Sequence, residues 1–198
     1  MTDQTLSGIR IAILATDGFE HSELTEPRSA LDAIGADTVV ISPKRDSVRG
    51  WKMKQWGDQV RVDQALCDAD PDDYDALLLP GGVINADALR MMGDAVEFVG
   101  TFFDDGKPVG AICHAPWILI ESGNVKGRTL TSWPSLKTDL INGGAHWVNQ
   151  EAVVDGQLVT SRNPDDIPAF NREITRLFDR FGRQHERHRH PDRPRTAI

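Results

Sequence analysis

The chain alternates short, almost wholly apolar runs with longer segments of helical periodicity. The runs at 10–15, 38–41, 75–79 and 109–112 have the length and continuity of strands that are buried on both faces. Helical patterns lie among them, and the first of these patterns ends at Gly35. Strands that alternate with helices predict one α/β domain, a three-layer sandwich with a mainly parallel sheet covered on both faces.

Three further segments belong to the predicted order of elements. Alternating apolar residues over 48–62 predict a β-hairpin, and a one-sided apolar pattern over 87–103 predicts a helix that buries Met91. A closing helix over 163–181 is predicted from its apolar stripe and from Asn163-Pro164, a pair typical of a cap and a first helical position. Because ligands of parallel α/β sheets bind at the carboxyl ends of the strands, we expect the site there.

Composition narrows the function classes. The formal net charge of −8 argues against binding to nucleic acid or to anionic membranes. The two cysteines make no disulfide framework, and no apolar run has the pattern of a secretory signal or the length of a membrane span. We therefore expect a cytoplasmic protein with no membrane and no nucleic-acid partner. Residues 1–182 are expected to form the domain, and 183–198, rich in arginine and histidine, a disordered tail.

The segment 108–117, Pro-Val-Gly-Ala-Ile-Cys-His-Ala-Pro-Trp, carries the strongest chemical signal. An apolar strand ends abruptly at Cys113, and a helix-like segment opens directly behind it. Ala111 and Ala115 stand two places away on each side, where a sharp strand-to-helix turn leaves no room for bulky side chains. The positive end of the following helix favours a thiolate over a thiol. Cys113 is therefore the candidate nucleophile.

Five motifs, taken in order, resemble those of the PfpI superfamily, which includes intracellular cysteine endopeptidases, a protein deglycase and bacterial general stress proteins. The resemblance covers residues 8–181 and is strongest to the PfpI branch. It implies a flavodoxin-like fold with a nucleophile elbow. The motifs lie at 16–20 (TDGFE), 78–82 (LLPGG), 111–116 (AICHAP), 142–147 (NGGAHW) and 158–166 (LVTSRNPDD).

The resemblance assigns roles to residues at the turns where three strands end. It implies that Cys113 attacks a carbonyl carbon and that a protonated Glu20 lies beside the sulfur, so that the two groups share one proton. The alternative for Glu20 is an acid that stabilises the dipole of the following helix. Backbone N–H groups of Gly81, Gly82 and His114 are expected to form an oxyanion hole, although the two glycines also suit a plain strand-to-helix turn.

His114 directly follows the nucleophile, and an adjacent side chain on an elbow normally points away from the reacting atom. In endopeptidase-like members of the superfamily, the matching histidine is the base and is held by an acid from a neighbouring subunit. The resemblance places the glutamate of these endopeptidase-like members at the position of Ala86, so the neighbouring Asp87 becomes the candidate for that acid. The alternative for Asp87 is the N-cap of a helix that begins at Ala88. The resemblance also implies a homo-oligomer, a dimer or larger.

The remaining candidate residues have structural alternatives. Trp117 and Trp133 are expected either to line the pocket or to pack beneath the elbow. His146 is expected either to shape the mouth of the pocket or to be structural, and Cys67 to be an inert thiol. The sequence has no phosphate-binding glycine motif and no zinc-type spacing of cysteine and histidine, so neither a cofactor nor a metal is expected.

Three functions remain open. The resemblance implies a cysteine-dependent stress-protection hydrolase that acts on reactive dicarbonyls or on glycated protein side chains. The alternative within enzymes is a PfpI-type intracellular peptidase that uses Cys113, His114 and an acid from a neighbouring subunit. The alternative outside enzymes is a redox sensor or holdase in which Cys113 is oxidised. The expected partners are a small carbonyl compound, or a protein or peptide substrate, and further copies of the chain.

Overall fold

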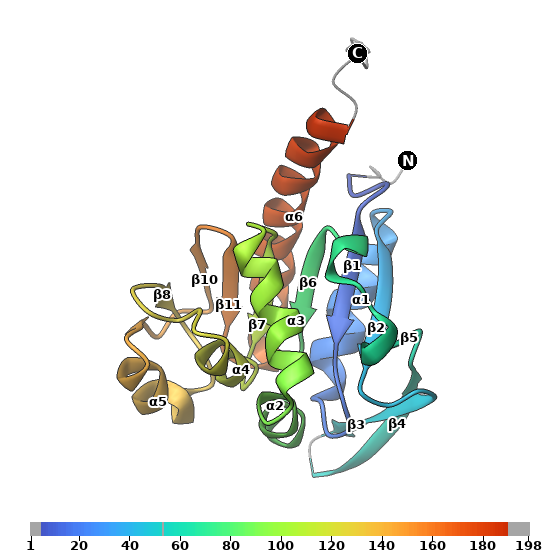
Figure 1. The fold of residues 1–198 in the computed structure, drawn as a ribbon. Coiled ribbons are helices and arrows are strands. Elements are labelled where there is room, and N and C mark those ends of the chain that lie inside the picture. Colours follow the sequence, from blue (N-terminus) through green and yellow to red (C-terminus); the bar gives the residue numbers. More distant parts are fainter. Residues whose placement is uncertain (1–4, 53, 190–198) are drawn as a thin grey trace.

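A seven-stranded, mainly parallel sheet forms the middle layer of the molecule (Figure 1). The computed structural model describes residues 5–52 and 54–189. The strands follow the order β10-β11-β7-β6-β1-β2-β5, in which β10 is antiparallel to β11 and the other neighbours run parallel. Strands β2, β1, β6, β7 and β11 thus have the flavodoxin-like order, which confirms the predicted fold class. The strands of this sheet are β1 (Arg10–Leu14), β2 (Asp37–Ser42), β5 (Gln64–Ala65), β6 (Ala76–Leu79), β7 (Val109–Ile112), β10 (Ala152–Asp155) and β11 (Leu158–Ser161).

Helices cover both faces of this sheet (Figure 1). Helices α1 and α6 pack together on one face, and α2, α3 and α4 lie on the other. The helices are α1 (His21–Ala33), α2 (Val83–Arg90), α3 (Gly93–Asp104), α4 (Pro116–Glu121), α5 (Lys137–Asn142) and α6 (Ile167–Arg189). Short 3-10 turns lie at Leu66–Asp68, Pro71–Asp73, Pro134–Leu136 and Pro164–Asp166. Two small sheets complete the described part of the structure. In one, β3 (Ser47–Lys52) pairs with β4 (Gln55–Arg61) as the predicted hairpin, and in the other, β8 (Thr129–Leu130) pairs with β9 (His146–Trp147).

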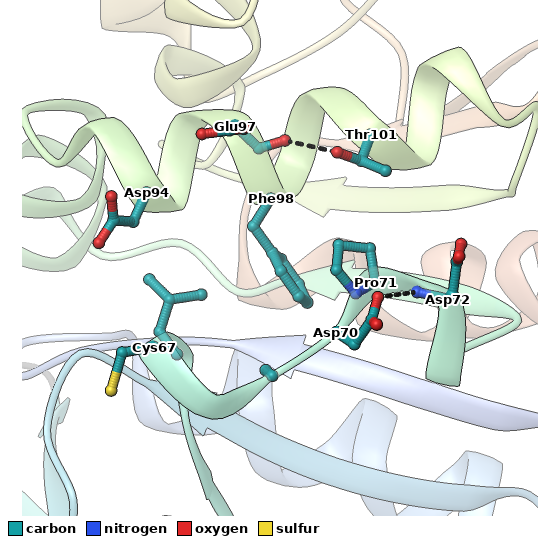
Figure 2. Close-up of a pocket in the computed structure, with 10 residues that line it drawn as sticks. Cys67, Asp70, Pro71, Asp72, Asp94, Glu97, Phe98 and Thr101 are labelled. Carbon is teal, nitrogen blue, oxygen red and sulfur yellow. Dashed lines mark hydrogen bonds between the residues drawn. The ribbon is translucent and has the colours of Figure 1, made fainter.

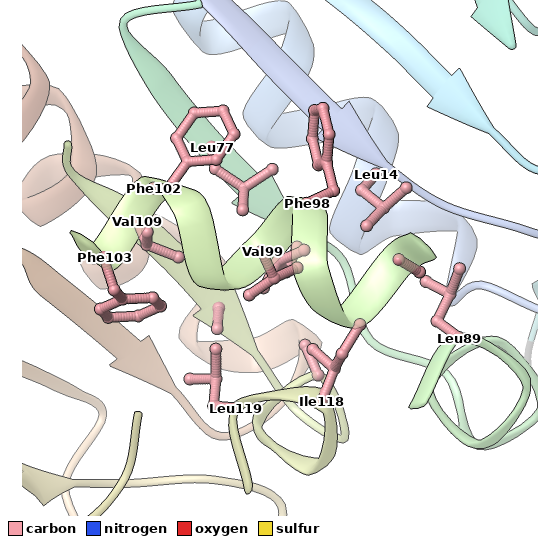
Figure 3. Close-up of a cluster of buried hydrophobic side chains, with 14 of the residues drawn as sticks. Leu14, Leu77, Leu89, Phe98, Val99, Phe102, Phe103, Val109, Ile118 and Leu119 are labelled. Atoms are coloured by element: carbon pink, nitrogen blue, oxygen red, sulfur yellow. The ribbon is translucent and has the colours of Figure 1, made fainter. Parts of the chain in front are cut away.

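Alternate strand residues supply the two halves of the hydrophobic core. In β1, Ile13 belongs to the cluster beneath α1 and α6, whereas Leu14 belongs to the cluster beneath α3. Figure 3 shows this second cluster, in which Phe98 and Phe102 of α3 lie over the sheet. Each such side chain contributes about 1.5–3 kcal/mol when it is fully buried. Burial on both faces explains why the strands read as continuous apolar runs rather than as alternating ones.

Two helices replace the single helix predicted over 87–103. Helix α2 begins at Val83, directly after the glycine pair, and the chain is extended at Met92 before α3 begins at Gly93. Both helices pack on α4, and α3 in addition lies on the sheet against β6, so the break lets the two pieces take different directions. Met91, predicted on the buried side, is 80% exposed at this break. The prediction was wrong because a continuous apolar pattern does not reveal a change of helix direction.

The closing helix is longer than predicted. Asn163 caps a 3-10 turn, where its Oδ1 accepts the N–H of Asp165 at 3.0 Å, and α6 then runs from Ile167 to Arg189. Part of the segment expected as a tail is therefore helical, and 190–198 lies outside the described residues. Helix α6 extends past the end of the sheet (Figure 1). None of the helices in the described ranges combines the length and apolar composition that crossing a bilayer requires.

Candidate active site

The chain turns sharply at Cys113, the residue that follows β7. Its φ of 65° makes it the one non-glycine residue with a positive φ in the described ranges. This conformation costs a residue with a side chain about 1–2 kcal/mol, so the surrounding structure must hold it. The N–H of Cys113 donates to the carbonyl oxygen of Ser161 at 3.0 Å, and its carbonyl oxygen accepts from the N–H of Trp133 at 2.9 Å. Helix α4 begins at Pro116, which completes the strand-turn-helix geometry of a nucleophile elbow.

The carboxyl group beside the sulfur belongs to Glu23, which corrects the expected place of Glu20. Glu23 lies in the first turn of α1, is fully buried, and interacts through its side chain with the sulfur of Cys113. Its Oε2 accepts a hydrogen bond from the N–H of Gly81 at 2.9 Å. Glu20 precedes the helix and is half-buried, and its N–H donates to the Gly81 carbonyl oxygen at 3.2 Å. Because α1 begins at His21, its first turn carries Glu23 rather than Glu20 inward.

A sequence signal for Glu23 exists in the buried stripe of α1. Leu24, Pro27 and Leu31 of this helix are buried, and Glu23 lies one turn before Pro27 on the same side. An acid within an apolar helical stripe is rare unless it has a partner. This pattern, rather than the order of motifs along the chain, identifies Glu23 as the buried carboxyl group.

Burial sets the protonation of this pair. Burial, followed by the charge of Glu20, raises the pKa of Glu23 to about 8, against the effect of the hydrogen bond from Gly81. Burial also raises the pKa of Cys113, and a charged Glu23 would raise it further, whereas the N–H groups of Gly82 and His114 lower it. At neutral pH the pair therefore rests as a thiol beside a neutral carboxyl group. The positive end of helix α4 was expected to favour a thiolate, but it does not offset the effect of burial on the pKa of Cys113.

The imidazole of His114 lies against the sulfur, contrary to the expectation for a residue adjacent to an elbow nucleophile. Its Nδ1 is 3.1 Å from Sγ of Cys113. The left-handed conformation of Cys113 redirects the chain at this point, which accounts for the contact. Burial lowers the pKa of His114 to about 4, so the ring is neutral at neutral pH. In the tautomer protonated on Nε2, Nδ1 can take a proton from the thiol.

The two glycines after β6 differ in what their N–H groups do. The N–H of Gly81, expected in an oxyanion hole, is instead occupied by Glu23. The N–H groups of Gly82 and His114 point to the sulfur of Cys113 and supply two donors of the kind that an oxyanion hole needs. A Cβ on Gly81 would lie 2.5 Å from Oε2 of Glu23, and Gly82 has a φ of 92°, so glycine is required at both positions.

Asn85, which the sequence analysis missed, ties this turn to the rest of the site. It is buried in α2, and its Oδ1 accepts the N–H of Thr16 at 2.7 Å. Its Nδ2 donates to the carbonyl oxygens of Pro80 and Gly81 at 3.0 and 3.1 Å. One side chain therefore joins the segments that follow β1 and β6. A single asparagine in a helical pattern gives no sign of such burial, and only the geometry reveals it.

Asp87 lies in the middle of α2 and is exposed. Its alternative role as the N-cap of a helix beginning at Ala88 is wrong, because α2 already begins at Val83. Ala86, where the resemblance to endopeptidase-like members led us to expect a glutamate, is buried. The imidazole of His114 has its side-chain hydrogen bond with Cys113 and its ring contacts with two tryptophans.

Trp117 and Trp133, both predicted as possible pocket residues, enclose the imidazole of His114. Trp133 is stacked on it, with ring centroids 5.8 Å apart and an interplanar angle of 25°. Trp117 meets it edge-on, with centroids 5.3 Å apart and an angle of 61°. Trp117 is partly buried and donates from Nε1 to Oδ2 of Asp139 at 2.9 Å, whereas Trp133 is 40% exposed. His146, in contrast, is exposed on the small sheet of β8 and β9.

Two pockets lie outside the contacts of the elbow. One of about 410 Å³ is lined partly by the exposed Cys67 and by Phe98 of α3 (Figure 2). The other, of about 370 Å³, is lined partly by Glu20 and Lys52. Cys113 lines neither pocket and is 6% exposed, so only a small group can reach its sulfur in this conformation. Within the described ranges, no group of three or more side chains is arranged to hold a metal ion.

The sequence is similar to curated proteins over most of its length. A deglycase of Pyrococcus abyssi is 43% identical over 170 residues, which cover 86% of this chain and 99% of that protein. General stress protein 18 of Bacillus subtilis is 45% identical over 175 residues, with 87% and 99% covered. The putative cysteine protease YraA of the same organism is 43% identical over 170 residues, with 85% and 98% covered.

Solved structures share the fold. A two-domain protein of Anabaena variabilis, with a DJ-1/ThiJ/PfpI-like and a ferritin-like domain, matches with a TM-score of 0.80 and 31% identity, over 88% of this chain and 48% of that chain. DJ-1beta of Drosophila melanogaster matches in fold with a TM-score of 0.77 and 24% identity, over 90% of this chain and 97% of that chain. The sequence model of the DJ-1/PfpI family matches residues 9–177. The chain, with its elbow cysteine and buried glutamate, therefore belongs to the DJ-1/PfpI family.

Proposed function

We propose that this protein is a cysteine-dependent hydrolase that removes reactive dicarbonyls such as methylglyoxal, or early glycation adducts on protein side chains. The proposal rests on one observation, the meeting of three groups at one turn. Sγ of Cys113 lies 3.1 Å from Nδ1 of His114 and against the buried carboxyl group of Glu23. A thiol, a neutral base and a neutral acid together suit nucleophilic addition to a carbonyl group. The names of the deglycase relatives support the same chemistry.

Burial of the nucleophile favours a small reacting group. Cys113 is 6% exposed and His114 is 7% exposed. A peptide main chain would need an open groove at the sulfur, because its own side chains flank every carbonyl carbon. The terminal aldehyde carbon of a small dicarbonyl, or of an adduct at the tip of a long side chain, is not surrounded by such side chains. The geometry therefore supports dicarbonyls and side-chain adducts over a polypeptide main chain.

In the addition step, protons pass among the side chains of Cys113, His114 and Glu23. Sγ of Cys113 bonds to the aldehyde carbon, the thiol proton passes to Nδ1 of His114, and the carbonyl π electrons move to the oxygen. The N–H groups of Gly82 and His114 stabilise that oxyanion, which becomes the hydroxyl of a hemithioacetal on taking the proton of Glu23. The imidazolium then returns its proton to the carboxylate of Glu23.

For a dicarbonyl, the second stage completes the hydrolysis. The proton on the hemithioacetal carbon moves, by way of the same base, to the neighbouring carbonyl carbon. The hydroxyl proton of the hemithioacetal passes to the oxygen of the neighbouring carbonyl at the same stage. The first carbon thereby becomes a thioester and the second carries a hydroxyl group. Water cleaves the thioester, which frees the thiol and releases a 2-hydroxy acid. The net change is the addition of one water to the dicarbonyl, so no external oxidant or reductant is consumed.

Replacement of Cys113 tests the proposal. In Cys113→Ala, we expect methylglyoxal consumption and 2-hydroxy acid formation to fall by about 100-fold or more, because the nucleophile is lost. Cys67→Ala is the matched control, since it removes an exposed thiol that lies outside the site, and it should retain its turnover. Unchanged consumption of methylglyoxal in Cys113→Ala would refute the proposal.

A PfpI-type peptidase is the second candidate, and exposed apolar side chains beside the site favour it. Val83 and Ile84 at the start of α2 are 52% and 47% exposed, and Met91 just after its end is 80% exposed. Such a surface favours contact with another copy of the chain, which could bring an acid toward His114. We propose a homo-oligomer on this ground. Light scattering tests it, and a monomer in solution would argue against the peptidase.

A further inference from the structure

The imidazole of His114 lacks the usual second hydrogen bond of a catalytic histidine. A histidine base is normally oriented by an acid or a carbonyl group that accepts from its other ring nitrogen. In the described ranges, the one side-chain hydrogen bond of this ring is the contact of Nδ1 with Sγ of Cys113. Asp87 is exposed on α2, and Ala86 beside it is buried. Within the described part of a single copy of the chain, the groups that meet the ring in this way are therefore the thiol of Cys113 and two indoles.

Two indoles lie against the imidazole, and they differ in how they are held. The indole of Trp117 contacts His114 with its edge and is itself fixed by Asp139 at 2.9 Å and by the Arg90 guanidinium, 5.4 Å from its ring centroid. The indole of Trp133 lies nearly parallel to the imidazole, at 25°. The backbone of Trp133 is bonded directly to the elbow, because its N–H donates to the carbonyl oxygen of Cys113 at 2.9 Å.

We propose that Trp133 is a positioning residue for His114: its indole, stacked on the imidazole and anchored to the elbow through the backbone, holds Nδ1 toward Sγ of Cys113. A stacked ring restricts rotation of the imidazole out of its plane, which a single hydrogen bond to sulfur does not. The same indole also shields one face of the imidazole from water. This inference rests on the proposed function in one respect, namely that His114 takes the proton of the thiol.

The charged groups near the imidazole do not account for its orientation. The Cys113 thiol contacts Nδ1, and the Glu23 carboxyl group lies beyond the sulfur. On the other side, Arg90 and Asp139 meet the indole of Trp117 rather than the imidazole. The titratable or charged groups on the elements packed around the ring include Cys113, Glu20, Glu23, Asp87, Arg90, Glu121, Lys137 and Asp139.

Three variants in a Cys67→Ser background test the proposal, so that Cys113 is the one remaining thiol. Trp133→Leu removes the flat ring, and Trp133→Phe keeps one. Trp56→Leu is the matched control, because Trp56 is 44% exposed, similar to the 40% of Trp133, and lies in the β3–β4 hairpin. Nitrogen NMR then follows the titration and tautomer of the imidazole of His114, with His114→Gln used to assign its signals.

We expect Trp133→Leu to raise the pKa of His114 from about 4 by about one unit or more, toward the ordinary value near 6.5, because water then reaches the imidazole. The fixed tautomer should also be lost, and alkylation of Cys113 by iodoacetamide at neutral pH should slow by about tenfold. Trp133→Phe should restore all three readouts to near wild type, and Trp56→Leu should leave them unchanged.

The outcome that overturns the proposal is a Trp133→Leu protein, folded by circular dichroism, whose His114 titration, tautomer and Cys113 alkylation match those of wild type. Failure of Trp133→Phe to restore them would equally remove the role of the stacked ring. None of these readouts uses a dicarbonyl. A wild-type protein that does not consume methylglyoxal would therefore refute the proposed function while leaving the test of Trp133 intact.

Discussion

Glu23→Gln should change the pH dependence of stability in a direction that the structure specifies. Glu23 is fully buried, and burial, with the charge of Glu20, raises its pKa from 4.5 to about 8. The folded protein therefore holds this proton more tightly than the unfolded chain, so stability falls as pH rises between 4.5 and 8. Each unit removes about 1.4 kcal/mol, which amounts to about 5 kcal/mol over that interval. Glutamine stays neutral and can still accept from the N–H of Gly81, so the variant escapes this loss.

Guanidinium unfolding curves, followed by tryptophan fluorescence at fixed protein concentration from pH 4.5 to pH 8, measure the effect. Wild type and Glu23→Gln should have similar unfolding free energies at the acid end, and the variant should be more stable by several kcal/mol at the alkaline end. Glu26→Gln, an exposed change on the same helix, is the control and should follow wild type. Parallel curves for wild type and Glu23→Gln would refute a neutral Glu23 in the folded protein.

Three further variants test other parts of the structure. Gly81→Ala would place a Cβ 2.5 Å from Oε2 of Glu23, so denaturant titration should show a loss of about 3 kcal/mol; wild-type stability would mean that the turn relaxes freely. Phe170→Ala removes a fully buried ring of α6 and should lower the unfolding free energy by about 3–5 kcal/mol, and a loss below about 1 kcal/mol would contradict its packing. Asp87→Asn, at an exposed position, should change methylglyoxal turnover by less than about twofold. A large loss would instead support Asp87 as the acid that a neighbouring subunit supplies to His114.

The sheet was predictable because each of its central strands is buried on both faces. The runs that became β1, β2, β6 and β7 are too short and too continuously apolar for amphipathic helices, and turn residues bound them. The segment from Val83 to Asp104 was less predictable. Its apolar residues continue through Met91, but α3 packs on β6 as well as on α4, and tertiary contacts determine where one helix ends and the next begins.

The nucleophile was predictable from local sequence, and its partners were less so. Cys113 stands between small residues at the end of a strand, which is a pattern that few other turns require. The inward position of Glu23 depends on where α1 begins, because a shift of that boundary by one or two residues changes which acid faces the sulfur. The contact of His114 with the sulfur depends on a positive φ at the preceding cysteine, which residue type does not predict.

The donors that face the sulfur at the elbow belong to the main chain, at Gly82 and His114. A substitution that alters a side chain at the rim leaves these N–H groups where they are, provided that the two turns keep their shape. The groups that stabilise negative charge here are thus different atoms from the side chains at the rim. Side chains at the rim can therefore vary without rebuilding the main-chain donors that face the sulfur.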